Sequence, residues 1–159
     1  MIIKGIRDED FLQYKLPSML VAFPSCTFKC EKECGCKGMC QNGALATSPN
    51  IEISAKAIVD RYMNNPITKA LVCGGLEPFD TYTQLLELLT EFRCNSEDVI
   101  IIYTGFCKDE IKEKLGYIVK FIPNVIIKFG RYIPNQKPHY DPLLGIQLAS
   151  DNQYAEKIS

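Results

Sequence analysis

The sequence predicts an α/β domain with mostly parallel strands. Short apolar runs rich in β-branched residues alternate along the chain with amphipathic segments, which is the pattern of strands joined by crossover helices. The runs are largely apolar, as expected for strands covered on both faces. The 159 residues, of which 47% are hydrophobic and 23% charged, are enough for one sizeable core. No repeat or long linker interrupts them, so we expect a single domain over residues 1–159.

Four strands are expected, at residues 19–23, 69–73, 99–103 and 125–129. Prolines flank the first strand, Gly74 and Gly75 end the second, and Thr104 and Gly105 end the third. Residues 118–121 form either a fifth strand or the lead-in to the fourth, and the pattern leaves both readings open.

Three helices are expected between these strands. The first begins after Ser54, a favourable N-cap, and ends at an Asn-Asn-Pro sequence. The second has Thr81 at its N-cap and Gln84 three residues later, which is a capping-box spacing. The third is short, begins near Asp109, and ends with Gly116 just beyond its C-cap.

The charge balance argues against two classes of partner. Lys and Arg number 18 and Asp and Glu number 19, giving a net charge of -1, so no overall positive field attracts nucleic acid or an anionic membrane. Charged residues soon interrupt the apolar N-terminus, and no later apolar run approaches the roughly 20 residues that cross a bilayer. We therefore expect a cytoplasmic protein, in which clustered cysteines bind metal rather than form disulfides.

Five of the eight cysteines lie within fifteen consecutive residues: Cys26, Cys30, Cys34, Cys36 and Cys40. Their spacing lacks the paired C-x2-C of a zinc ribbon, so zinc is left open but not favoured. Thiolates on a loop suit an iron–sulfur cluster, and three ligands instead of four would leave one iron open to a substrate or cofactor. The other three cysteines, Cys73, Cys94 and Cys107, are expected to pack as small buried hydrophobes.

The unusual residues all follow expected strands. The cysteine loop, residues 24–42, comes after the first strand, Gly74 to Pro78 after the second, and Thr104 after the third. Parallel strands place their carboxyl ends on one rim, where α/β folds build their binding sites. We therefore expect the cysteines and the glycine-rich turn to face the same cavity.

These segments resemble those of the radical S-adenosylmethionine (radical SAM) proteins, and more narrowly the activating enzymes of anaerobic (class III) ribonucleoside-triphosphate reductase. The resemblance runs from about residue 20 to the C-terminus and rests on Cys26-Thr-Phe-Lys-Cys30, Cys40-Gln-Asn42, Gly74-Gly-Leu-Glu-Pro-Phe-Asp80, Tyr103-Thr-Gly-Phe106 and Ser150-Asp-Asn-Gln153. It implies an incomplete, open TIM-like (β/α) barrel of the radical SAM type, because a full barrel takes about 250 residues.

The resemblance implies that Cys26, Cys30 and Cys40 bind a [4Fe-4S] cluster. The usual C-x3-C-x2-C motif of the family would then be C-x3-C-x9-C here. The choice of Cys40 depends on Asn42, because the family has an asparagine two residues after its third cysteine. Cys34 or Cys36 could replace Cys40 as the third ligand, or both could be exposed thiols, and the sequence leaves this open.

The resemblance also implies contacts to S-adenosylmethionine. The family's GGEP segment contacts the methionine amino group, which assigns this role to Gly74, Gly75 and Glu77, with Leu76 interposed. Glycine allows a close approach of the backbone, and a carboxylate suits an ammonium group. Thr104 is expected near the sugar of the cofactor, although an ordinary strand-to-helix turn explains it equally well.

The last segment, residues 124–159, resembles the C-terminal tail that distinguishes the activating enzymes. No physical role follows from the sequence for Ser150, Asn152 and Gln153, beyond lining the cofactor pocket or capping the last strand.

The implied activity is reductive cleavage of S-adenosylmethionine by the reduced cluster. This yields a 5′-deoxyadenosyl radical that abstracts a Cα hydrogen from a glycine of the reductase, with no catalytic residue beyond the two cofactors. A low-potential donor such as a flavodoxin or ferredoxin would supply the electron. The alternatives are a radical SAM enzyme acting on another protein or peptide, and a non-catalytic zinc or iron–sulfur binding module.

Overall fold

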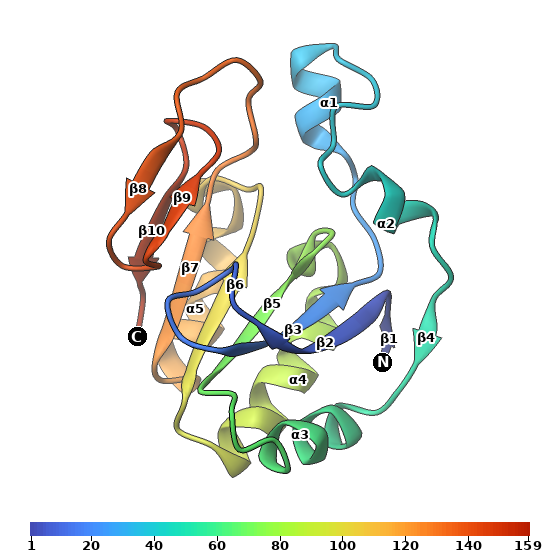
Figure 1. Ribbon diagram of the computed structural model, residues 1–159, viewed down its shortest axis with the longest axis vertical. Coiled ribbons are helices and arrows are strands. Elements are labelled where there is room, and N and C mark those ends of the chain that lie inside the picture. Colours follow the sequence, from blue (N-terminus) through green and yellow to red (C-terminus); the bar gives the residue numbers. More distant parts are fainter.

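A six-stranded sheet is the framework of the protein, and the computed structural model describes all residues from 1 to 159 (Figure 1). Its order is β10-β7-β6-β5-β3-β2, with bounds β2 (Gly5–Asp10), β3 (Ser18–Phe23), β5 (Ala70–Gly75), β6 (Val99–Tyr103), β7 (Val125–Phe129) and β10 (Tyr154–Lys157). The four central strands are parallel, and the edge strands β2 and β10 are antiparallel to their neighbours. The class is thus mixed α/β with a mostly parallel sheet.

The sheet is open and does not close into a barrel. The incomplete TIM-like barrel of the radical SAM type stays a prediction, as does the single-domain assignment of residues 1–159. None of the helices has both the length and the apolar character to cross a membrane.

All four expected strands are present, and β6 and β7 have the expected bounds. Strand β5 continues through Gly74 and Gly75, which were expected to end it, and Gly75 pairs with Phe23 of β3. Gly75 has a φ of 80°, and a Cβ at this position would lie 2.8 Å from the Cβ of Ala22. Glycine therefore lets the last residue of β5 approach β3 closely.

Three longer helices join the parallel strands: α3 (Ala55–Met63), α4 (Tyr82–Asn95) and α5 (Lys112–Phe121). Ser54 caps α3 as expected, since its hydroxyl accepts a hydrogen bond from the backbone N–H of Ala57. The capping box expected at α4 is wrong. Thr81 ends a short 3-10 helix, η1 (Pro78–Thr81), its side chain makes no capping bond, and the amide oxygen of Gln84 accepts from the N–H of Ile2 instead.

The third helix is present, but the end expected for it is wrong, and neither reading of residues 118–121 as strand or strand lead-in holds. A 3-10 turn, η2 (Lys108–Ile111), precedes α5, which runs through Gly116 and takes in residues 118–121. Leu115 and Ile118 both face the core. Their burial outweighs the roughly 1 kcal/mol that an internal glycine costs a helix.

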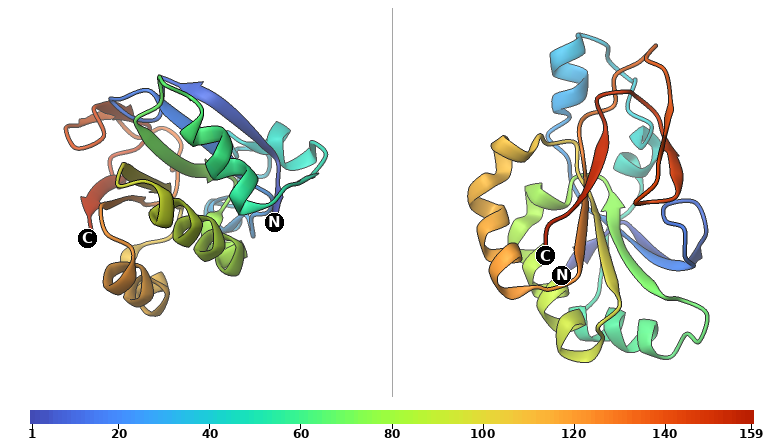
Figure 2. Two further views of the ribbon diagram at one scale, coloured as in Figure 1. Left: turned by 90° about the horizontal axis from the view of Figure 1, so that it is seen from below. Right: turned by 90° about the vertical axis from the view of Figure 1, so that its left-hand side faces the viewer.

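The two faces of the sheet are covered differently. Alternate strand residues pack against α3, α4 and α5 in a core of 25 buried residues. The opposite face carries a smaller cluster of seven, to which Tyr14, Leu144 and Leu148 contribute. A hairpin of β8 (His139–Asp141) and β9 (Ile146–Leu148) lies on this side, away from α4 and α5 (Figure 2). The second face is left partly open at the carboxyl ends of the strands.

Several short elements have no counterpart among the expected ones. They are β1 (Ile2–Ile3) with its partner β4 (Ile51–Glu52), the helices α1 (Lys29–Cys34) and α2 (Gly43–Thr47), and the strands β2, β8, β9 and β10. Cys73 is buried as expected, but Cys94 and Cys107 are exposed, so the packing role expected for these two is wrong.

Candidate iron–sulfur and cofactor site

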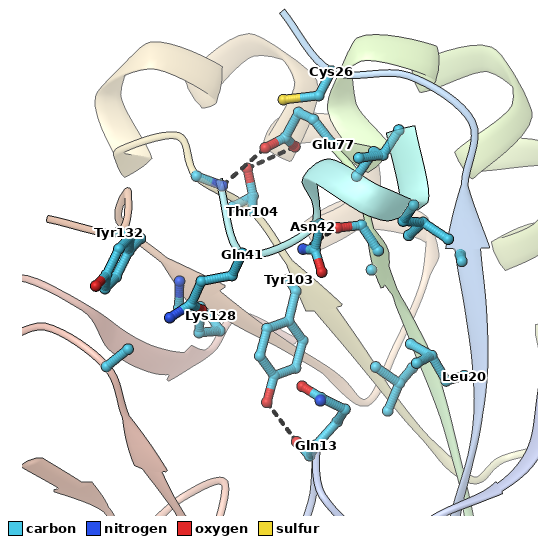
Figure 3. A pocket seen from close by; sticks show the side chains of 18 of the residues that line it. Gln13, Leu20, Cys26, Gln41, Asn42, Glu77, Tyr103, Thr104, Lys128 and Tyr132 are labelled. Atoms are coloured by element: carbon cyan, nitrogen blue, oxygen red, sulfur yellow. Dashed lines mark hydrogen bonds between the residues drawn. The ribbon is translucent and has the colours of Figure 1, made fainter. Parts of the chain in front are cut away.

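A cavity of about 720 Å³ opens at the carboxyl ends of β3, β5 and β6. Figure 3 shows Cys26 at one end of this cavity and Gln13 at the other, with Lys128 between them. Every residue that the sequence assigned to cluster or cofactor lines it: Cys26, Cys30, Cys40, Gly74, Gly75, Glu77 and Thr104. The cysteines and the glycine-rich turn therefore face the same cavity, as expected from the parallel strands.

The cysteine loop is folded so that three of its thiols reach the cavity. Phe28, in the left-handed conformation with a φ of 52°, starts α1 and donates its N–H to the sulfur of Cys26 at 3.2 Å. Further along, the carboxylate of Glu31 accepts the N–H of Cys40 at 3.0 Å, which brings the chain back after α1. Cys34 and Cys36 lie on the exposed part of the loop and do not line the cavity.

Burial keeps two of the cavity thiols, Cys26 and Cys30, in the neutral form. Burial raises the pKa of Cys26 to about 11, although the N–H of Phe28 opposes the shift. Burial and the neighbouring Cys40 raise the pKa of Cys30. No three His, Cys, Asp or Glu side chains are gathered closely enough to hold a single ion. Partly buried thiols around one space fit a multi-iron cluster, whose charge would compensate their deprotonation.

Glu77 connects the loops that follow β5 and β6. It is 6% exposed, and its Oε1 accepts from the hydroxyl of Thr104 at 2.8 Å and the N–H of Phe79 at 3.1 Å. Its Oε2 accepts from the N–H of Gly105 at 2.8 Å. Burial raises the pKa of Glu77 to about 7 against these bonds. The carboxylate was expected to face a ligand ammonium. It also connects the loop after β5 to the loop after β6 through these hydrogen bonds.

Thr104 has a structural role of the same kind. Its hydroxyl donates to Glu77 and accepts the N–H of Phe106 at 3.0 Å, so it shapes the turn after β6. Asn42 provides a third connection, because its side-chain amide donates to the carbonyl oxygen of Gly75. The cysteine loop is therefore tied directly to the glycine turn, which gives the Cys40-Gln-Asn sequence a physical basis.

Lys128 is a cavity residue to which the sequence gave no role. It lies in β7, is 7% exposed, and donates from its Nζ to the carbonyl oxygen of Gly130 at 2.8 Å. Burial lowers its pKa to about 8, against the opposing charge of Glu77. A lysine within the otherwise apolar run of residues 125–129 was the available signal, since a buried cation needs a partner.

Comparison with known proteins identifies the family. Residues 18–153 match the family described as "4Fe-4S single cluster domain". The chain belongs to this family. Among curated proteins and among solved structures, nothing matches. The protein is therefore an iron–sulfur protein with a 4Fe-4S cluster-binding domain. The assignment of Cys26, Cys30 and Cys40 as the cluster ligands stays a prediction.

The family match ends at Gln153, the last residue of a polar motif whose role was open. In this single-cluster domain the motif holds the turn that follows β7. The amide of Asn152 donates to the carbonyl oxygen of Arg131 at 3.0 Å, and the amide of Gln153 donates to that of Gly130 at 3.3 Å. The hydroxyl of Ser150 accepts the N–H of Ile133 at 3.2 Å. Gln153 also lines the cavity.

The turn after β7 places the side chain of Arg131 against the cysteine loop. The Arg131 side chain is 11% exposed and pairs with Glu110 at 2.6 Å and with Glu33 of α1 at 3.2 Å. Its guanidinium also lies over the ring of Phe106, 5.8 Å from the centroid. The pairing lowers the pKa of Glu110 to about 2. Arg131 thus joins the C-terminal tail, the turn after β6 and the cluster loop.

Proposed function

We propose that this iron–sulfur protein is a radical SAM activating enzyme that generates a glycyl radical on anaerobic ribonucleoside-triphosphate reductase. The observation that carries the proposal is the shared cavity: three thiols, the glycine turn and a buried lysine line one space at the carboxyl ends of parallel strands. A purely structural metal site needs no such space beside its ligands.

The cavity has the size and charges for S-adenosylmethionine. Its volume of about 720 Å³ lies within the roughly 300–1,000 Å³ of small-molecule sites. The methionine part of this ligand carries a carboxylate and an ammonium group. Lys128 supplies a buried cation for the carboxylate, and Oε2 of Glu77, with one protein donor, keeps a lone pair for the ammonium.

Cys26, Cys30 and Cys40 would hold the cluster, leaving one iron for the methionine groups of the second cofactor. When bound, the two cofactors supply the electron and the 5′-deoxyadenosyl radical that takes a hydrogen from the glycine Cα. The residues of the chain bind the two cofactors and orient them. Glu77 and Asn42 fix the loops around the ligand, and the far end of the cavity, near Gln13, leaves room for a peptide segment of the reductase.

The electron would come from a low-potential donor such as a flavodoxin or ferredoxin. Cys26 and Cys30 also line a small cleft on the side of the cluster loop that Lys29, Phe106 and Arg131 border. The cluster would then be within reach of a donor without opening the main cavity.

The experiment is electron paramagnetic resonance on the anaerobic mixture of reconstituted protein, S-adenosylmethionine, a reductant and the reductase. We expect a glycyl radical signal that requires all four components. The Cys40→Ser variant should give no signal, and the matched Cys94→Ser variant, which removes an exposed thiol elsewhere, should give the full signal.

Two results would overturn this assignment. Cleavage of S-adenosylmethionine without any radical on the reductase would indicate a different protein or peptide substrate. A protein that takes up zinc or iron but never cleaves S-adenosylmethionine would be the non-catalytic binding module.

A further inference from the structure

Three sulfur-bearing side chains that the cavity does not use lie together on the loop after α1. Cys34 is the last residue of α1, and Cys36 and Met39 follow within five positions. Both cysteines are exposed, and none of the three residues lines the main cavity or the small cleft beside it. The sulfur loop, residues 34–39, is therefore separate from the proposed cluster and cofactor site.

The backbone of the sulfur loop brings the sulfur atoms together. Gly35 and Gly38 adopt left-handed conformations, with φ values of 67° and 77°, and a Cβ at either position would meet no atom within 4 Å. Glycine is thus required by backbone conformation and not by crowding. The two turns reverse the chain so that the thiol of Cys34 contacts the thioether of Met39.

Cys36 joins the group through two hydrogen bonds to Cys34. Its N–H donates to the sulfur of Cys34 at 3.1 Å, and its own thiol lies 3.3 Å from the carbonyl oxygen of Cys34. Hydrogen bonds from the backbone to sulfur are a recurring feature of metal-bound thiolates, because they stabilise the charge on the sulfur.

The donor set selects the type of metal. Structural zinc takes four Cys, His or carboxylate ligands, and no third His, Cys, Asp or Glu joins Cys34 and Cys36. The third donor is a thioether, and a set of two thiolates and a thioether favours soft Cu(I) over harder ions. We propose that Cys34, Cys36 and Met39 bind one Cu(I) ion, with release of the two thiol protons.

Such a site would be close to the proposed cluster without sharing its ligands. Met39 is directly followed by Cys40, whose N–H is held by Glu31. Cu(I) on the sulfur loop would therefore order the segment that leads into Cys40.

The test is an anaerobic titration of the cluster-loaded protein with Cu(I) in competition with a coloured Cu(I) chelator. We expect the protein to withdraw one Cu(I) per chain while its iron content stays constant. The Cys34→Ser/Cys36→Ser variant should lose this binding, and Met39→Leu should weaken it about tenfold or more, since even second-shell changes cost 10–100-fold. X-ray absorption at the copper edge should show sulfur neighbours only.

The matched control is Cys94→Ser/Cys107→Ser, which removes two exposed thiols elsewhere in the chain and should bind Cu(I) like the wild type. Equal Cu(I) uptake by the wild type and by the Cys34→Ser/Cys36→Ser variant would overturn the proposal. So would loss of iron from Cys34→Ser, which would make Cys34 a cluster ligand. Neither S-adenosylmethionine nor the reductase enters the titration, so its outcome is distinct from that of the proposed activity.

Discussion

Replacing Lys128 should affect protein stability and the binding of S-adenosylmethionine in opposite directions, so this residue tests the proposed cavity. Its ammonium is buried, forms no salt bridge, and has one protein acceptor, the carbonyl oxygen of Gly130. Burial lowers its pKa from 10.5 to about 8, and at 1.36 kcal/mol per pH unit this corresponds to about 3 kcal/mol of destabilisation. A depressed lysine pKa means that the folded state disfavours the charged form. The cost is therefore fully present below pH 8 and is relieved as the pH rises from 8 to 10.5.

Replacing Lys128 with Met removes the buried charge and keeps most of the side-chain volume. The carbonyl oxygen of Gly130 still accepts from the amide of Gln153 at 3.3 Å, so it is not left without a donor. We expect Lys128→Met to raise the free energy of unfolding of the apoprotein by about 1–3 kcal/mol at pH 7. The same variant should lose binding of S-adenosylmethionine, because the cation for its carboxylate is gone.

The assay is urea denaturation of both apoproteins followed by circular dichroism, together with equilibrium dialysis of both cluster-loaded proteins against S-adenosylmethionine. The stability difference should shrink between pH 8 and pH 10.5, and taking the difference cancels the titration of the other groups. Lys112→Met, at an exposed position, should change stability by no more than about 0.5 kcal/mol. A less stable Lys128→Met protein would contradict the cost of the buried charge, and one that binds S-adenosylmethionine like the wild type would contradict the role of Lys128 in binding the carboxylate.

Three further variants test the core and the tail. Leu88→Ala should cost about 2–5 kcal/mol in urea unfolding, because Leu88 is fully buried in the main core, and a loss below 1 kcal/mol would contradict that packing. Gly130→Ala should cost about 1–3 kcal/mol, since its φ is 96° and the new Cβ would lie 2.9 Å from the carbonyl oxygen of Asn152; unchanged stability would rule out this turn. Arg131→Met should weaken iron retention against a chelator roughly tenfold, with partial rescue by Arg131→Lys, and equal retention would show that the pair with Glu33 does not hold the cluster loop.

The central strands could be predicted because each is a run of mainly apolar residues, with Lys128 of β7 as the one charged member. The edge strand β2 could not, because its sequence Gly-Ile-Arg-Asp-Glu-Asp is mostly charged and pairs on one side only. The helix ends were set by tertiary contacts. Gln84 bonds to Ile2 instead of closing a capping box, and the buried Leu115 and Ile118 carry α5 past Gly116.

The meeting of the cysteines with the glycine turn was predictable for a different reason. Parallel strands place their carboxyl ends on one rim, so sequence order alone indicated that Cys26 and Gly75 face one cavity. The role of Asn152 and Gln153 depends on through-space pairing. Asn152 reaches Arg131 and Gln153 reaches Gly130 because β10 runs antiparallel beside β7, with Tyr154 opposite Phe129, and no local pattern indicated that pairing.

The proposed activity is tested most directly by the iron content of the anaerobically reconstituted protein together with the products formed from S-adenosylmethionine on reduction. We expect about four irons per chain and equal amounts of methionine and 5′-deoxyadenosine. The Cys40→Ser variant should form neither product. A zinc-bound protein without visible absorption, or a full iron complement that leaves S-adenosylmethionine intact, would contradict the proposed activity.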